Sequence, residues 1–236
     1  MHPRRRRPQW PRLNQRVRLS VLGLAAVALL GTYLAAEHIP GWYRPPALTD
    51  GDLRRVRAEL TELFDGIGLR LAGREPFTVV IEEQQANAWL GALPELGLDL
   101  DWGRDLQDLR LPAGFSAPAV SFAPDTIRCG AHFIRGGWQA ILNADVSVDC
   151  RIDAGDVVIS LQRVRSGSLP VPLAVARRLV APPSLVASSL PSPSADAWRD
   201  DLTFRNRFLW PNGKLPFRIR AVHAERGLLT VELEPL

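Results

Sequence analysis

An uncharged apolar run near the N-terminus constrains this chain more than any other feature. Residues 19–36 read LSVLGLAAVALLGTYLAA and contain no charged side chain. These 18 residues, at about 1.5 Å per helical residue, would span roughly 27 Å, which is close to the hydrocarbon thickness of a bilayer. We therefore expect a single transmembrane helix at 19–36.

The residues on either side of the run predict its orientation. Seven arginines and no acid precede it: Arg4, Arg5, Arg6, Arg7, Arg12, Arg16 and Arg18. Few charges follow it, so the N-terminus should be cytoplasmic and the C-terminal domain extracytoplasmic, in the inner membrane. Trp10 before the run, and Trp42 and Tyr43 after it, are candidates for the aromatic belts at the two membrane surfaces.

A cleaved secretory signal is the alternative to an anchor. The apolar part of a signal is typically about 7–15 residues long and ends in a small-x-small cleavage site. This run is longer, and its possible exits, Tyr33-Leu34-Ala35 and Leu34-Ala35-Ala36, fit that pattern poorly. The sequence therefore favours an anchor. With either an anchor or a cleaved signal, the chain from about residue 45 onward is expected to be exported.

The net charge of +4 does not indicate a nucleic-acid partner. The chain has 29 basic and 25 acidic residues, and seven of the basic ones lie in the first 18 residues. The rest of the chain therefore has more acids than bases, so it lacks the basic surface that binds a polyanion. We expect no nucleic acid among its partners, and the lipid bilayer as a partner through residues 19–36.

The pattern divides the chain into a tail (1–18), an anchor (19–36), a stalk rich in Pro and Gly (37–52) and an exported β-rich domain (53–236). A helix is expected at 53–71, because apolar residues recur there at helical spacing. Thr49, with Asp52 three residues later, is a plausible N-cap. A short strand at 77–81 and a second helix at 82–93 should follow.

The clearest strand signal covers residues 138–152. One predicted face is apolar: Trp138, Ala140, Leu142, Ala144, Val146, Val148, Cys150 and Ile152. The other is mostly polar: Gln139, Ile141, Asn143, Asp145, Ser147, Asp149 and Arg151. Neighbouring strands at 127–133 and 157–164 complete an antiparallel meander, and three more are expected at 204–210, 217–223 and 229–234. Residues 173–181 could be helical.

These elements predict an α+β fold. We expect an N-terminal transmembrane helix followed by a curved antiparallel sheet of about eight strands, packed on one or two helices. The helix at 53–71 has a matching apolar stripe and should cover the apolar face of the sheet.

Two cysteines in an exported domain usually suggest a disulfide. A hairpin turning near Arg135-Gly136 would place Cys129 opposite Leu142, eight residues from Cys150 on the same strand. That separation is roughly 26 Å at ~3.3 Å per residue, whereas a disulfide needs Cα atoms within about 7 Å. We therefore predict two small core residues and no disulfide.

No motif for catalysis, metal binding or nucleotide binding is present in the sequence. There is no G-x-S-x-G elbow, Gly213-Lys214 lacks the P-loop frame, and the four histidines are not clustered. Asp145, Asp149 and Asp153 could form a carboxylate pair, although a solvated strand face is the commoner explanation. We expect no catalytic residue, metal site or cofactor.

Two short segments resemble parts of known proteins. Residues 77–90, FTVVIEEQQANAWL, resemble a strand followed by an E-Q-x-N-x-(W/Y)-L helix, and residues 165–172, RSGSLPVP, resemble a G-x-L-P-(V/L)-P turn. With the anchor, they resemble uncharacterised single-pass bacterial envelope proteins, including planctomycete ones, and are distantly similar to the YpmS-like family. The likeness spans about 45–175, with Gln85-Ala86 where that family often has Gln-Leu. It implies binding of a lipid or envelope component.

Three hypotheses for function follow. The first is a non-enzymatic envelope protein that binds a lipid or another apolar ligand between sheet and helix. Its candidate ligand-binding residues are Ile127, Phe133, Trp138, Leu142 and Val146. The second is an anchored structural or interaction module that recruits a protein partner, with Phe208-Leu209-Trp210-Pro211 as a candidate exposed patch. The third is a hydrolase-like enzyme that uses carboxylate chemistry.

Overall fold

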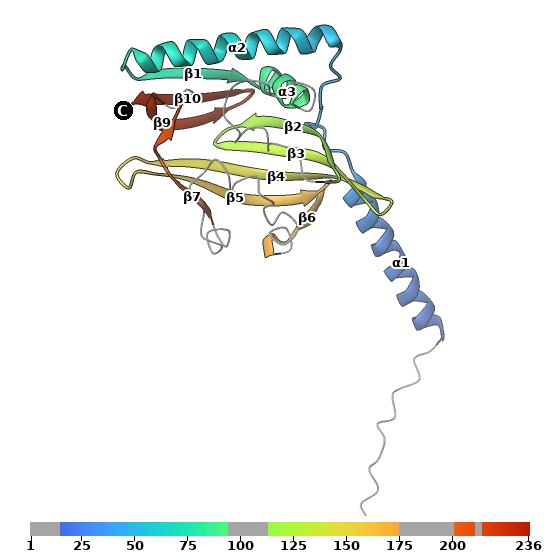
Figure 1. Ribbon diagram of the computed structural model, residues 1–236. Helices are drawn as coiled ribbons and strands as arrows, with labels where there is room; N and C mark the ends of the chain where they lie inside the picture. The colour runs from blue at the N-terminus through green and yellow to red at the C-terminus, as the bar shows by residue number, and fades with distance from the viewer. Residues whose placement is uncertain (1–14, 94–112, 175–200, 211–213) are drawn as a thin grey trace, which may run out of the picture.

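The computed structural model describes residues 15–93, 113–174, 201–210 and 214–236. These ranges contain three helices, α1 (Gln15–Glu37), α2 (Asp50–Ala72) and α3 (Glu83–Ala92). Their strands form two antiparallel sheets, of four and six strands (Figure 1). The α+β class is confirmed, but two sheets replace the single curved sheet that the sequence predicts.

The four-stranded sheet has the order β1-β10-β9-β8 and is covered by α2 (Figure 1). Its strands are β1 (Phe77–Glu82), β8 (Phe208–Leu209), β9 (Pro216–Glu225) and β10 (Leu228–Pro235). The buried core between helix and sheet consists of Ile67, Leu71, Val79 and Leu233. The apolar stripe of α2 is therefore core, as predicted, but it covers this sheet and not the meander around residues 138–152.

The start of α2 is fixed by a capping box, as predicted. The Asp52 backbone N–H donates to the Thr49 hydroxyl, and the Thr49 backbone N–H donates to the Asp52 carboxylate at 3.0 Å. Each bond satisfies a donor that the first turn of a helix leaves without a backbone partner. The hydrogen bonds from Thr49 hold the pKa of Asp52 below its usual value.

The six-stranded sheet has the order β2-β3-β4-β5-β6, and β7 pairs with another part of β5. Its strands are β2 (Phe115–Ala123), β3 (Thr126–Arg135), β4 (Trp138–Arg151), β5 (Asp156–Ser166), β6 (Leu169–Val171) and β7 (Asp201–Arg205). The predicted meander is confirmed as β3-β4-β5. Arg135 pairs with Trp138 across the turn, so Cys129 lies opposite Ala144 and the predicted pairing with Leu142 is wrong.

The two sheets meet at their turns. The Asp125 N–H donates to the Ala224 carbonyl at 3.0 Å, and the Gly227 N–H donates to the Phe122 carbonyl at 3.2 Å. The buried Asn206 makes a further link, because its side-chain amide bonds to both backbone groups of Ile219. Asn206 also separates β7 from β8, so the single strand predicted at 204–210 is wrong and its two halves belong to different sheets.

Trp42 and Tyr43, in the segment that connects α1 to α2, pack on one face of the six-stranded sheet. Tyr43 is buried beside Ile141, and Trp42 packs against the same cluster. The Tyr43 hydroxyl donates to the Ala117 carbonyl at 2.5 Å. This contact with protein replaces the aromatic belt predicted for Trp42 and Tyr43. It also explains why Ile141 is 5% exposed although the alternation puts it on the polar face.

The C-terminal end of α1 is held by the turn between β5 and β6. The Ser168 N–H donates to the Ala35 carbonyl at 2.9 Å, and the Ser166 hydroxyl donates to the Ala36 carbonyl at 3.3 Å. A Cβ added to Gly167 would lie 2.6 Å from three carbonyl oxygens of residues 35, 36 and 38, so this close contact requires glycine. The predicted G-x-L-P segment thus joins α1 to the folded domain.

Within the ranges described above, no helix is both long enough and apolar enough to cross a membrane. Two other expectations lie outside those ranges: the belt residue Trp10 and most of the helix predicted at 173–181. Two strands, β2 and β6, were not predicted from the sequence.

Candidate functional site

The five predicted ligand-binding residues lie on one face of the six-stranded sheet. Ile127 pairs with Val146, Phe133 pairs with Ala140, and Leu142 pairs with Ala131. Because paired residues point to the same side of a sheet, Ile127, Phe133, Trp138, Leu142 and Val146 share a face. All five side chains are half-buried. The alternation in the sequence therefore predicts correctly which residues lie together, and we call this surface the apolar face.

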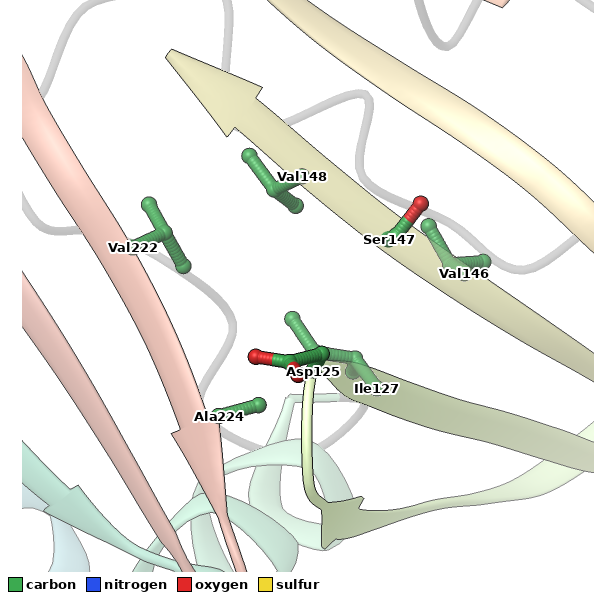
Figure 2. A pocket seen from close by; sticks show the side chains of 7 residues that line it. All are labelled: Asp125, Ile127, Val146, Ser147, Val148, Val222 and Ala224. Carbon is green, nitrogen blue, oxygen red and sulfur yellow. The ribbon is translucent and has the colours of Figure 1, made fainter.

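A hollow of about 120 Å³ lies at one end of the apolar face, between the two sheets (Figure 2). Its lining residues are Asp125, Ile127, Val146, Ser147, Val148, Val222 and Ala224. An apolar cavity of ~150 Å³ admits a benzene molecule, so this hollow has room for the end of an apolar group and not for a whole lipid. Val222 and Ala224 come from β9, almost a hundred residues after Ile127, and alternation within one strand gives no signal for them.

Aromatic rings occupy the opposite end of the apolar face. The Phe133 ring lies 4.8 Å from the Phe115 ring and 5.8 Å from the Trp138 ring, measured between centroids. These separations fall in the range of favourable aromatic pairs. Phe115 belongs to β2, so the sequence alone did not place it here.

Cys129 lies near the middle of the apolar face, where it pairs with Ala144. Burial, with a smaller contribution from the negative charge of Asp145, raises the pKa of the Cys129 thiol to about 11. Burial also raises the pKa of Cys150. Both cysteines are free, which agrees with the prediction that they form no disulfide.

Asp145 and Asp149, two of the three carboxylates considered for catalysis, do not pair with each other. Asp145 faces three arginines, whereas Asp149 forms an ion pair with Arg151 at 3.2 Å. Asp145 and Asp149 are four residues apart on β4, about 13 Å at ~3.3 Å per residue, which is longer than the usual separation of a hydrolytic carboxylate pair. In the described ranges, no group of three or more His, Cys, Asp or Glu side chains could hold a metal ion.

The helix segment that carries the family resemblance has a structural role. The Val120 N–H donates to the Asn87 side-chain oxygen at 2.8 Å, and the Asn87 amide donates to the Val120 carbonyl at 2.9 Å. The Phe122 N–H donates to the Glu83 carboxylate at 2.7 Å. These side chains pair the outer edge of β2 as a further strand would. Trp89, on the same helix, is partly buried and packs against the cluster of Val56 and Ala92.

The candidate patch at 208–210 is only partly exposed, because Trp210 packs against other residues of the domain. The Trp210 ring stacks on the Phe64 ring of α2, with 5.3 Å between centroids, and also contacts the Phe217 ring. Leu209 is 64% exposed. Trp210 is therefore part of the core, while Pro211 lies outside the described residues.

No protein-family model, curated protein or solved structure matches this chain.

Proposed function

We propose that this chain is a non-enzymatic envelope protein, anchored in the inner membrane by residues 19–36, that binds a lipid or another apolar ligand. Its N-terminus is cytoplasmic and its two sheets are extracytoplasmic in this proposal. The ligand lies along the apolar face of the six-stranded sheet. This location differs from the space between sheet and helix, since α2 packs on the other sheet.

The observation that carries the proposal is the length and composition of the apolar face. Trp138 and Val146 are eight residues apart on β4, which is about 26 Å at ~3.3 Å per residue. One leaflet of a bilayer has a hydrocarbon thickness of about 15 Å, half of the ~30 Å core. The apolar face is therefore long enough to hold a lipid acyl chain, with the aromatic rings at one end and the hollow at the other.

Native mass spectrometry of the full chain, extracted from membranes in mild detergent, tests the proposal. The wild type should retain lipid in near-stoichiometric amounts. Leu142→Arg places a charge on the apolar face, so the retained lipid should be lost, because an uncompensated charge in an apolar site is unfavourable. Gln139→Arg is the matched control, since Gln139 is exposed on the other face of the same strand and its substitution should leave the lipid in place.

A clean ligand-free mass for the wild type, or equal lipid retention by Leu142→Arg, would contradict the proposal. The alternative function, an anchored module that recruits a protein, instead predicts a stoichiometric protein partner in the same preparation. Circular dichroism of each variant separates loss of binding from loss of folding.

A further inference from the structure

The second face of the six-stranded sheet carries three arginines around one acid. Arg128 on β3, and Arg163 and Arg165 on β5, each place a guanidinium nitrogen 3.9 Å from the carboxylate of Asp145 on β4. The arginine side chains are 40%, 60% and 31% exposed, whereas Asp145 is 13% exposed. We call Arg128, Arg163 and Arg165 the arginine cluster.

Asp145 balances only part of the charge of the arginine cluster. Among the residues that the structure describes, three guanidinium groups face one carboxylate, which leaves an excess of two positive charges. These distances of 3.9 Å are also longer than a hydrogen bond, so the three ion pairs with Asp145 are loose. By contrast, Arg218 approaches Glu234 at 2.9 Å on the four-stranded sheet, with Arg220 at 3.6 Å from the same carboxylate. The arginine cluster is therefore suited to a second anion.

The arginine cluster lies close to the end of α1. Arg165 directly precedes Ser166, whose hydroxyl binds the Ala36 carbonyl. Arg163 is four residues from Gly167, about 13 Å along β5 at ~3.3 Å per residue. Trp42, in the segment that leaves α1, packs over Gly130, which pairs with Asn143 next to Arg165. Figure 1 shows α1 leaving the domain beside β5 and β6.

We propose that Arg128, Arg163 and Arg165 bind the phosphate groups of anionic membrane lipids and so hold the sheet against the bilayer. This inference rests on the proposed anchor, because a helix inserted up to residue 36 brings the arginine cluster near the headgroups. A guanidinium has a planar set of donors that matches a phosphate group, and its positive charge is attracted to an anionic surface. The group that the arginines bind is a phosphate monoanion or a phosphate diester in a lipid headgroup.

The test uses the full chain in nanodiscs that contain phosphatidylcholine and phosphatidylglycerol. Native mass spectrometry then counts the anionic and zwitterionic lipids that stay on the protein after the nanodisc is removed. The wild type should retain phosphatidylglycerol in preference to phosphatidylcholine. The double variant Arg128→Gln/Arg163→Gln should lose that preference. The control Arg218→Gln/Arg220→Gln removes the same charge from the other sheet and should keep it.

A second variant should change the preference for phosphatidylglycerol in the opposite direction, which misfolding would not do. Asp145→Asn removes the one acid of the arginine cluster, so the preference for phosphatidylglycerol should increase above the wild-type value. The proposal is overturned if the wild type shows no preference, or if both double variants lose it equally. It is also overturned if inorganic phosphate abolishes the preference at low concentration, since the site would then bind free phosphate and not a lipid surface.

Whether the chain is anchored in the membrane is tested separately in the same samples. Extraction of membranes with alkaline carbonate leaves an integral protein in the pellet, whatever the arginine cluster does. If the protein stays in the pellet but shows no headgroup preference, only the proposal for the arginine cluster is contradicted. A chain released by carbonate removes the anchor, and the headgroup proposal with it.

Discussion

At the scale of single residues, Cys129 reports on the packing of the apolar face. Its pKa is raised to about 11, mainly by burial, so its thiol stays protonated near neutral pH. Iodoacetamide should therefore modify Cys150 well before Cys129 in the folded protein, and the rate at Cys129 should increase as the pH approaches 11. Peptide mapping by mass spectrometry measures both rates. Equal rates at neutral pH in the folded chain would show that the middle of the apolar face is open to solvent.

Alternation along a strand predicts which residues share a face but not the register between strands. The hairpin turns at Gly136 and Gly137, which both have positive φ values, 60° and 82°. A two-residue turn of this kind places Arg135 opposite Trp138, one position later than a turn centred on Arg135-Gly136. The predicted partner of Cys129 was wrong for this reason, while the five candidate residues still shared a face.

At the scale of elements, α3 protects the edge of the six-stranded sheet through Asn87. Asn87→Ala would leave both backbone groups of Val120 without their side-chain partner, at a cost of about 1–3 kcal/mol in the free energy of unfolding. Urea denaturation measures the loss, and hydrogen exchange of the Val120 amide should become faster. Gln84→Ala, an exposed position on the same helix, is the control. Unchanged stability and exchange in Asn87→Ala would contradict this role.

The elements missed or merged in the sequence have irregular backbones. β2 contains Pro118, and Ala117 has a φ of 48°, where the pairing with β3 shifts register. Proline is tolerated in strands at such irregularities, but it interrupts the alternating pattern by which a strand is recognised in a sequence. Likewise, residues 204–210 look like one strand, because nothing local shows that Asn206 is buried by distant contacts with Ile219.

At the scale of the whole molecule, the chain between α1 and α2 packs on the six-stranded sheet through Tyr43 and on the core between α2 and α3 through Leu48. Residues 38–49 read as a broken stalk because Pro and Gly exclude regular structure. They nevertheless bury Tyr43 against the sheet, and the turn at Gly167 binds the end of α1. The sequence predicts that these segments lack regular structure. Where they pack depends on contacts between residues that are 74 to 133 positions apart, which sequence patterns do not reveal.

The proposed function depends on one claim, which is that an apolar ligand lies along the apolar face while the chain is in its membrane. A photoreactive amino acid placed at position 142 tests this claim in intact membranes, with the same amino acid at position 139 as the control. Illumination followed by mass spectrometry of the full chain identifies what each position contacts. A lipid-sized adduct at 142 and none at 139 is the predicted result. The same yield at both positions, or no adduct at 142 in a folded chain, would contradict it.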